Sequence, residues 1–280
     1  MTRIHLADKA IVSVSGTDAE HFLQNLVTTD IESVSPNEAW PGALLTPQGK
    51  IMLEFLVLRS GDGFLLETHE DDVATLVQRL TLYKLRAKVE IASTESKGVT
   101  VFLDEDAPSN AVLDHRFDIA GLKLYRSPGF HEGAQPNNEA YSSARIRCGV
   151  AEMHSDYATQ DVFPHDILFD KNGGVSFRKG CYVGQEVVSR MQHRGTARRR
   201  LIGVSANSKL PNSGAAITAG GKSAGTLGSI SEHQGLAIVR TDRIASAIKN
   251  GSPVLAGEVP VEVSPFDWSG VSLDSEPQED

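Results

Sequence analysis

The sequence predicts an α+β protein that ends in a small all-β unit, and three observations lead to this prediction. The first ninety residues hold runs of alternating apolar and polar residues together with two runs of helical spacing. From residue 98 onward, a second set of strand-like runs surrounds one helix-like run. After residue 200, short strand-like runs are separated by Gly and Asn turns, which is typical of a small barrel or sandwich.

The first region combines strands with two helices. A capping-box pattern at residues 17–20 predicts a helix whose apolar stripe covers residues 22–27. Residues 73–80 place apolar side chains at i, i+3, i+4 and i+7, which predicts a second helix. Residues 44–51 indicate a strand, a turn built on Pro and Gly, and another strand. The expected strands cover residues 10–15, 51–58, 64–67 and 85–91.

The second and third regions have different textures. In the second, a helix over residues 139–148 should end at Gly149, and a loop rich in Pro, Gly and Asn should precede it at residues 127–138. Its expected strands cover residues 99–103 and 119–125. The expected strands of the third region cover residues 201–204, 215–219, 222–230, 236–239 and 259–263.

These patterns divide the chain into three domains and a tail. We expect an α+β domain at residues 1–95, a second α+β domain at residues 96–197 and a β domain at residues 198–270. Residues 271–280 form an acidic tail, whose composition is typical of disordered segments.

Composition excludes several classes of protein. A formal net charge of −9 disfavours general nucleic-acid binding, because phosphate contacts need Lys and Arg. The two cysteines, Cys148 and Cys181, cannot supply four ligands to a cluster or close a Cys-rich zinc site. No His spacing indicates a metal site, and no apolar run approaches ~18 residues, so we expect no membrane span. The chain start has no signal-peptide pattern, and we expect a cytoplasmic protein with free thiols.

The segment over residues 177–200 concentrates positive charge. It holds seven Lys and Arg residues and a single acid, Glu186, in a chain that is acidic as a whole. Such a concentration favours an anion site. For the run Arg198–Arg200 alone, a solvated charged face is the other interpretation.

Cys181 lies inside this basic segment, beside Lys179 and between two glycines. A neighbouring cation favours the thiolate form of a cysteine, and glycine lets the backbone approach a ligand closely. Gln185 and Glu186 add an amide and a carboxylate that can hydrogen-bond a heteroaromatic ring. We therefore expect Cys181 to be functional, although a lone cysteine is most often a small buried apolar side chain.

The stretch Lys179–Glu186 matches the pattern K-G-C-aromatic-x-G-Q-E at every position. Through it the chain resembles the YgfZ family of folate-binding accessory proteins of iron–sulfur cluster biogenesis. Further landmarks of that family match at residues 22–30, 44–50, 83–86, 145–149 and 163–164, so the resemblance covers most of the chain. The wider family includes the glycine-cleavage T-protein, an aminomethyltransferase.

The resemblance implies a three-lobed ring with tetrahydrofolate in a central channel, in which two α+β lobes precede a small β-barrel. It implies Cys181 and Lys179 as the reactive groups. The residues expected to hold the pterin ring are Gln185, Glu186, Tyr182, Asp30 and Gln48, and those expected at the anionic folate tail are Arg190 and Arg194.

The function that the resemblance implies is assembly or repair of 4Fe–4S enzymes. Our own hypothesis is that Cys181 ligates iron transiently or exchanges sulfur, because the chain has too few cysteines to hold a cluster by itself. Folate and iron–sulfur assembly proteins or client enzymes would be the partners. A folate-dependent aminomethyltransferase is an alternative, although residues 67–72 lack the Asn-Ala-Gly turn of the T-protein and offer only Asp71 or Asp72. A tRNA-modification accessory that binds tRNA through residues 194–200 is another. Whether the chain is an enzyme stays open.

Overall fold

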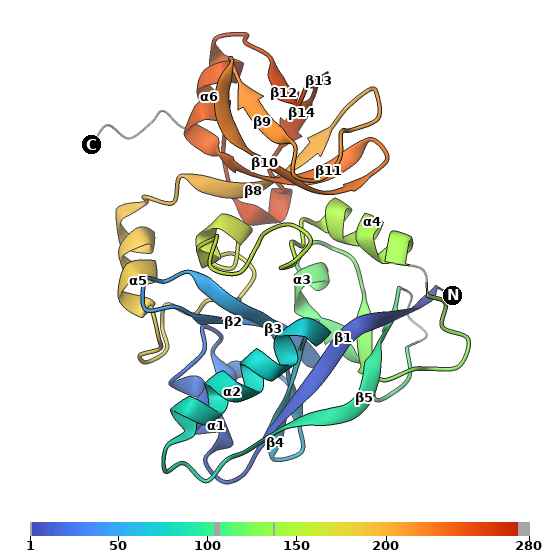
Figure 1. Cartoon of the computed structure of the whole chain (residues 1–280), viewed down its shortest axis with the longest axis vertical. Helices are drawn as coiled ribbons and strands as arrows, with labels where there is room; N and C mark the ends of the chain where they lie inside the picture. The colour runs from blue at the N-terminus through green and yellow to red at the C-terminus, as the bar shows by residue number, and fades with distance from the viewer. Residues whose placement is uncertain (1, 104–106, 137, 274–280) are drawn as a thin grey trace.

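The computed structural model describes residues 2–103, 107–136 and 138–273. Two sheets dominate it: a closed barrel in the first half of the chain, and a seven-stranded sheet near the C-terminus. Figure 1 shows the C-terminal sheet seated above the N-terminal barrel, with the helix α5 and irregular segments between them. The expected α+β class with a C-terminal β unit is confirmed.

The N-terminal barrel closes through seven strands in the order β1-β4-β3-β2-β6-β7-β5, with β5 returning to β1. Neighbouring strands run antiparallel except β2 and β6, which are parallel. The strands are β1 (Arg3–Ser15), β2 (Glu38–Leu45), β3 (Ile51–Ser60), β4 (Gly63–His69), β5 (Glu90–Phe102), β6 (Val112–Asp114) and β7 (Tyr125–Pro128).

The boundary expected between residues 95 and 96 falls inside β5. This strand pairs with β1 along both of its halves, from Ser15–Glu90 at one end to Arg3–Phe102 at the other. The later strands β6 and β7 then complete the same sheet. The chain does not separate at that point, and its division into domains stays a prediction.

Six α-helices surround the sheets in the described part of the chain. They are α1 (Ala19–Gln24), α2 (Val73–Lys84), α3 (His115–Asp118), α4 (Asn138–Cys148), α5 (Gln185–Arg194) and α6 (Thr241–Lys249). The described residues also include four short 3₁₀ helices, namely η1 (Ile31–Ser33), η2 (Glu70–Asp72), η3 (Pro164–Ile167) and η4 (Asp267–Ser269). The expected helices at residues 73–80 and 139–148 are confirmed, whereas the expected strand at 119–125 is wrong, because α3 and a turn at Gly121 (φ 81°) precede β7.

The C-terminal sheet has the order β13-β12-β9-β10-β11-β8-β14 and its own apolar core. Helix α6 packs on it through Ile244 and Ala247. Its strands are β8 (Arg199–Ser205), β9 (Ala216–Ala219), β10 (Lys222–Ser231), β11 (Gln234–Arg240), β12 (Val254–Ala256), β13 (Val259–Pro260) and β14 (Glu262–Ser264). Residues 274–280 of the expected acidic tail lie outside the described residues.

A separate apolar core lies where the two sheets meet. It brings Leu45 and Ile51 of the barrel together with Tyr182, Val188 and Leu201. The segment that carries Cys181 is thereby packed between the barrel and the C-terminal sheet. None of the described helices is long and apolar enough to span a membrane.

Candidate functional site

Residues 176–184, which we call the thiol loop, are tied to the segment that follows α1. The Ser176 amide donates to Thr28 O at 2.9 Å, and the Thr28 hydroxyl donates to Gly174 O at 2.6 Å. The Lys179 ammonium donates to two backbone carbonyls, Val27 O at 2.8 Å and Thr29 O at 2.6 Å. These bonds fix the loop on both sides of Ser176, so Cys181 is held by a constrained backbone.

Lys179 is a half-buried cation in this loop. Burial lowers its pKa to about 8, while the carboxylates of Asp30 and Glu32 act in the opposite direction. Its ammonium also lies 5.8 Å from the centre of the Tyr182 ring. Near neutral pH, Lys179 therefore places a positive charge under the thiol loop, held there by carbonyl oxygens.

The thiol loop ends at Gly184, which begins helix α5. Gly184 has a φ of 80°, and a Cβ there would lie 2.6 Å from Thr46 O. The partner surface is the tight turn Thr46–Gly49, closed by a hydrogen bond from the Gly49 amide to Thr46 O at 2.8 Å. Only glycine allows both the backbone conformation and this close approach.

Tyr182 is an anchor of the loop in the core between the sheets. Its side chain is 6% exposed, and it packs with Leu45, Ile51 and Val188. Its hydroxyl has no hydrogen-bond partner among the described residues, and burial raises its pKa. An aromatic residue at this position thus holds the loop by apolar contact, and Tyr182 is placed for packing rather than for contact with a ligand in solvent.

The two cysteines have opposite environments. Cys181 is exposed on the thiol loop, whereas Cys148 is buried at the end of α4. Burial raises the pKa of the Cys148 thiol against the opposing influence of Arg147. Among the two thiols, only Cys181 is accessible to a metal ion or another protein.

The other residues expected at the site lie in two places. Some lie on the exposed face of helix α5, and the others lie near the points where the thiol loop is held to the barrel. Glu186, Arg190 and Arg194 follow one another at four-residue intervals on α5, so they share one exposed helix face. Gln185 contacts Gly180 O at 3.4 Å, and Gln48 is exposed on the turn that supports Gly184.

Asp30 lies on the opposite side, near Lys179. Its carboxylate accepts hydrogen bonds from Gln24 at 2.9 Å and from Ser33 at 3.1 Å. The structure thus gathers Lys179, Asp30 and Tyr182 at the base of the thiol loop. It leaves the cations of α5 on the outer surface.

Two cations of the basic run at residues 198–200 are bound to carboxylates of this chain. Arg199 forms ion pairs with Asp161 at 3.5 Å and Asp166 at 3.8 Å. Arg200 binds Asp170 at 2.8 Å and donates to His165 O at 2.7 Å. Arg199 and Arg200 fasten the start of β8 to the η3 region, which is a structural role.

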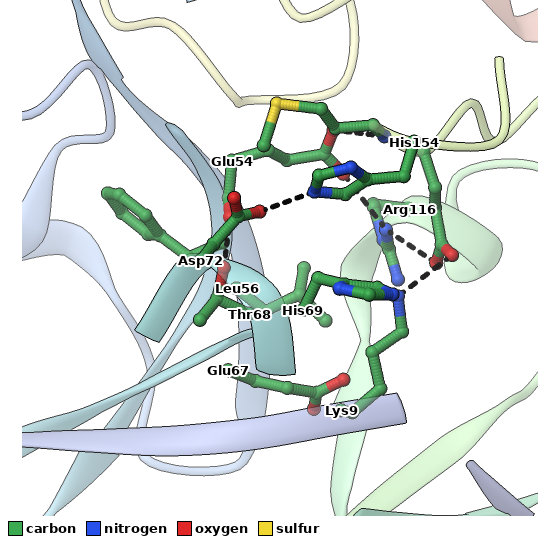
Figure 2. A pocket seen from close by; sticks show the side chains of 12 residues that line it. Lys9, Glu54, Leu56, Glu67, Thr68, His69, Asp72, Arg116 and His154 are labelled. Atoms are coloured by element: carbon green, nitrogen blue, oxygen red, sulfur yellow. Dashed lines mark hydrogen bonds and ion pairs between the residues drawn. The ribbon is translucent and has the colours of Figure 1, made fainter. Parts of the chain in front are cut away.

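A second candidate site, the charged pocket, lies in the N-terminal barrel (Figure 2). Its side chains come from β1, β3, β4, η2, α3 and the segment after α4, and none of them was expected as a site residue except Asp72. The cavity holds about 30 Å³, which is room for roughly two water molecules. Its polar lining consists of Lys9, Glu54, Glu67, Thr68, His69, Asp72, Arg116, Glu152 and His154.

Two buried carboxyl groups of this pocket have opposite electrostatics. Burial acts to raise the pKa of Glu152, but Lys9, Arg145 and Arg116 hold it well below its ordinary value. Lys9 donates to Glu152 at 3.0 Å, and the Tyr141 hydroxyl donates at 2.6 Å. For Glu54, burial and the neighbouring Glu152 raise the pKa. The pocket therefore pairs a carboxylate whose pKa is held low with a carboxyl group whose pKa is raised.

Two histidines form the rim of the pocket. Figure 2 shows His154 bonded to Asp72, and the distance between its Nε2 and the Asp72 carboxylate is 2.8 Å. The His69 and His154 rings lie 4.5 Å apart. His154 has a φ of 71°, a conformation that is unfavourable for a residue with a side chain. Across the described residues, no group of three or more His, Cys, Asp or Glu side chains is arranged to hold a metal ion.

The charged pocket does not fit a pterin ring as it stands. Pockets for small organic ligands are typically ~300 Å³ or larger, about ten times its volume. The oxygens of Glu152 are already taken by Lys9 and Tyr141, and Glu54 accepts from Tyr157 and from the Met153 amide. None of the residues expected to hold folate lines this pocket.

The sequence held one signal for the pocket that our expectations did not use. Glu54 interrupts the apolar strand over residues 51–58, and Glu152 lies between Ala151 and Met153 in an apolar run. A carboxylate inside a buried run needs a partner, so such positions predict buried ion pairs.

Known proteins match the C-terminal sheet and, more broadly, most of the chain. Residues 198–271 match the CAF17 C-terminal beta-barrel domain. The chain is 31% identical over 217 residues to the mitochondrial iron–sulfur cluster assembly factor IBA57 homolog of Pyricularia oryzae, covering 70% of this chain and 55% of that protein. It is 27% identical over 227 residues to the homolog of Neurospora crassa, covering 70% and 52%. The chain thus spans about half the length of the curated relatives it matches.

Two expectations need correction. These relatives are named IBA57 homologues and not YgfZ proteins, so the specific family expected from the motif over residues 179–186 is not the one that the comparisons show. They are also named mitochondrial, which contradicts the expected cytoplasmic location. Targeting segments are separate from the fold, so composition and cysteine count of a folded region do not report its compartment.

A solved structure completes the comparison. The glycine cleavage system aminomethyltransferase T of Bartonella henselae superposes with a TM-score of 0.69, covering 96% of this chain and 86% of that protein at 13% identity. At this identity the likeness establishes the fold alone. The chain therefore has the fold of an aminomethyltransferase T with a C-terminal β-barrel, and its sequence is similar to that of IBA57-type iron–sulfur cluster assembly factors.

Proposed function

We propose that this chain assists the assembly or repair of iron–sulfur clusters, with Cys181 as a single transient thiolate ligand. The observation that carries the proposal is the exposure of Cys181 on a loop whose backbone is fixed at Ser176, Lys179 and Gly184. Similarity to proteins named iron–sulfur cluster assembly factors supports it. Because a cluster needs several ligands, the remaining ones must come from a partner. That partner is an assembly protein or a 4Fe–4S client enzyme.

The chemistry asked of Cys181 is simple. The thiol releases its proton to solvent, and the thiolate then donates an electron pair to an iron ion that the partner presents. No electron is transferred in this step. The two carbonyl bonds of Lys179 fasten the loop to the segment after α1, and Cys181 stays exposed on that loop. A ligand that contributes one bond is easily released, which suits a transfer step.

The test expresses the Cys181→Ser and Cys148→Ser variants in cells that lack the gene for this chain and compares the activity of 4Fe–4S enzymes. We expect Cys181→Ser to lose the activity of 4Fe–4S enzymes, because the accessible thiolate is removed. Cys148→Ser is the matched control, since this thiol is buried and should matter only for packing. Full 4Fe–4S enzyme activity with a folded Cys181→Ser chain would overturn the proposal.

Tetrahydrofolate, which the resemblance implied, has weaker support. The shared fold favours it, but the charged pocket is too small for a pterin ring and its carboxylates are already bonded. The alternative of aminomethyl transfer depends on the same ligand, and Asp72 is bonded to His154. We therefore derive no step through folate.

Direct tRNA binding also has little support. Residues 194–200 would have to contact the phosphates of tRNA. Within this run, Arg199 and Arg200 are already bound to aspartates of this chain. A tRNA-modification effect would then be indirect, through a modifying enzyme that contains a cluster.

A further inference from the structure

A tight turn follows helix α2 and contains an unusual residue. The Ala87 amide donates to Lys84 O at 2.8 Å, which closes a four-residue turn. Its second residue, Leu85, has φ 46° and ψ −106°. These angles are close to those of the first central position of a type II′ turn, where glycine is normally required. A leucine in this conformation is strained.

Among the described residues, no apolar core takes up the Leu85 side chain and compensates for this strain. The Leu85 side chain is 88% exposed and belongs to none of the apolar cores. One turn earlier on α2, Leu82 is 63% exposed. Glycine at position 85 would relieve the backbone and expose less apolar surface. A strained backbone that presents an apolar side chain to solvent is a physical basis for a hypothesis of function.

Positive charge surrounds the two leucines. Residues 79–88 contain four cations and no acid, although the chain as a whole has a net charge of −9. In the described part of the chain, none of these four side chains forms an ion pair or hydrogen bond. We call this area the α2-end surface; it consists of Arg79, Leu82, Lys84, Leu85, Arg86 and Lys88. Figure 1 places the end of α2 on the side of the barrel remote from the C-terminal sheet.

The composition of this surface favours one kind of occupant. The apolar stripe of α2 is already used, because Leu76 and Leu80 face the core, and Leu82 alone gives the helix too small an exposed apolar face to lie on a membrane. Nucleic acid would use the cations but not Leu85. A protein partner uses both, because an apolar side chain can fill a pocket while charges steer the encounter. We propose that the α2-end surface docks an acidic protein partner, whose apolar pocket receives Leu85.

This proposal stands apart from the iron–sulfur role, and its test does not use cluster chemistry. Leu85 is replaced in the full-length chain by the photo-crosslinking residue p-benzoylphenylalanine, and cells are illuminated. The crosslinked peptide is then identified by mass spectrometry. A second variant carries the probe at Leu82, an exposed position within helix α2. It replaces the Leu85 variant in the experiment if that variant does not fold. The matched control is the same probe at Ile248, an exposed apolar residue on the C-terminal unit.

We expect one discrete protein adduct from the α2-end probes and none from Ile248. The crosslinked segment should be acidic, and Arg86→Glu with Lys88→Glu should lower adduct yield about tenfold. Reversing the acids of the partner to lysine should restore it. A lipid adduct, a nuclease-sensitive adduct or a second copy of this chain would overturn the proposal. So would the absence of an adduct, or an adduct unaffected by charge reversal.

Discussion

At the scale of single residues, Lys179 gives the clearest link between burial and pH. Its pKa is about 8 in the folded chain, below the ordinary 10.5. Between these two pH values the unfolded chain binds more protons, so the contribution of Lys179 to stability increases as pH rises from 8 to 10.5. We expect the free energy of unfolding of wild type, relative to Lys179→Met, to increase over this window.

Urea denaturation at several pH values measures this difference. Groups that titrate in both proteins cancel in the comparison, which isolates Lys179. Lys171→Met, at an exposed lysine, serves as the control. A difference between wild type and Lys179→Met that stays constant with pH would contradict the burial of this amine.

The motif over residues 179–186 drew attention to Lys179 and Cys181, whose roles stay predictions. That Lys179 is held by the carbonyls of Val27 and Thr29 could not be inferred from the motif, because these partners are distant in sequence. Lys9 and Glu152 were missed, since they are separated by 143 positions and only barrel closure brings them together. Likewise, the aspartates that bind Arg199 and Arg200 could not be inferred from the basic run itself.

At the scale of elements, the start of α5 depends on Gly184. We expect Gly184→Ala to destabilise the chain by roughly 2 kcal/mol or more, because a Cβ would meet Thr46 O at 2.6 Å and the φ of 80° disfavours alanine. The shift should also displace the thiol loop. Gly180→Ala is a matched control in the same loop, since a Cβ there meets nothing within 4 Å. Equal stability of the two variants in thermal denaturation would be evidence against this role.

Elements with strong periodicity were predicted correctly, and the failures have physical causes. Helix α2 follows from its apolar spacing at residues 73–80. The strand expected at residues 85–91 is wrong over residues 85–89, where the chain turns after α2. Residues 90–91 and most of the expected strand at 99–103 belong to one strand, β5, because pairing with β1 carries the polar residues between them. Helix α5 was not predicted, because its residues are mostly polar. The basic segment over residues 177–200 was interpreted only by its charge.

At the scale of the whole molecule, a chain of buried ions joins the barrel to the C-terminal sheet. It begins at Arg126, which binds Glu67 and, at 2.7 Å, Asp114. Arg116 continues it from Asp114 towards Glu152. Such charges are stabilising only while each keeps its partner. The chain of ions thus makes the barrel and the segment after α4 interdependent.

The last ion pair of this chain of buried ions reaches the C-terminal sheet. Arg145 binds Asp156 at 2.8 Å and donates to the Ser229 hydroxyl at 2.9 Å, while Asp156 accepts from the Ser229 amide at 2.7 Å. Asp156→Ala would leave Arg145 buried without this partner and the Ser229 amide without an acceptor. We expect it to destabilise the chain by ~3–5 kcal/mol. The C-terminal sheet should then unfold separately from the barrel.

Differential scanning calorimetry tests this coupling. Wild type should show one cooperative transition, and Asp156→Ala should show two, the first at lower temperature. Asp118→Ala, which removes an exposed pair with Lys123, is the control and should leave the profile nearly unchanged. A single transition at the wild-type temperature in Asp156→Ala would mean that apolar packing alone joins the sheets. The core that contains Tyr182 and Leu201 would then carry that coupling, and with it the position of the thiol loop.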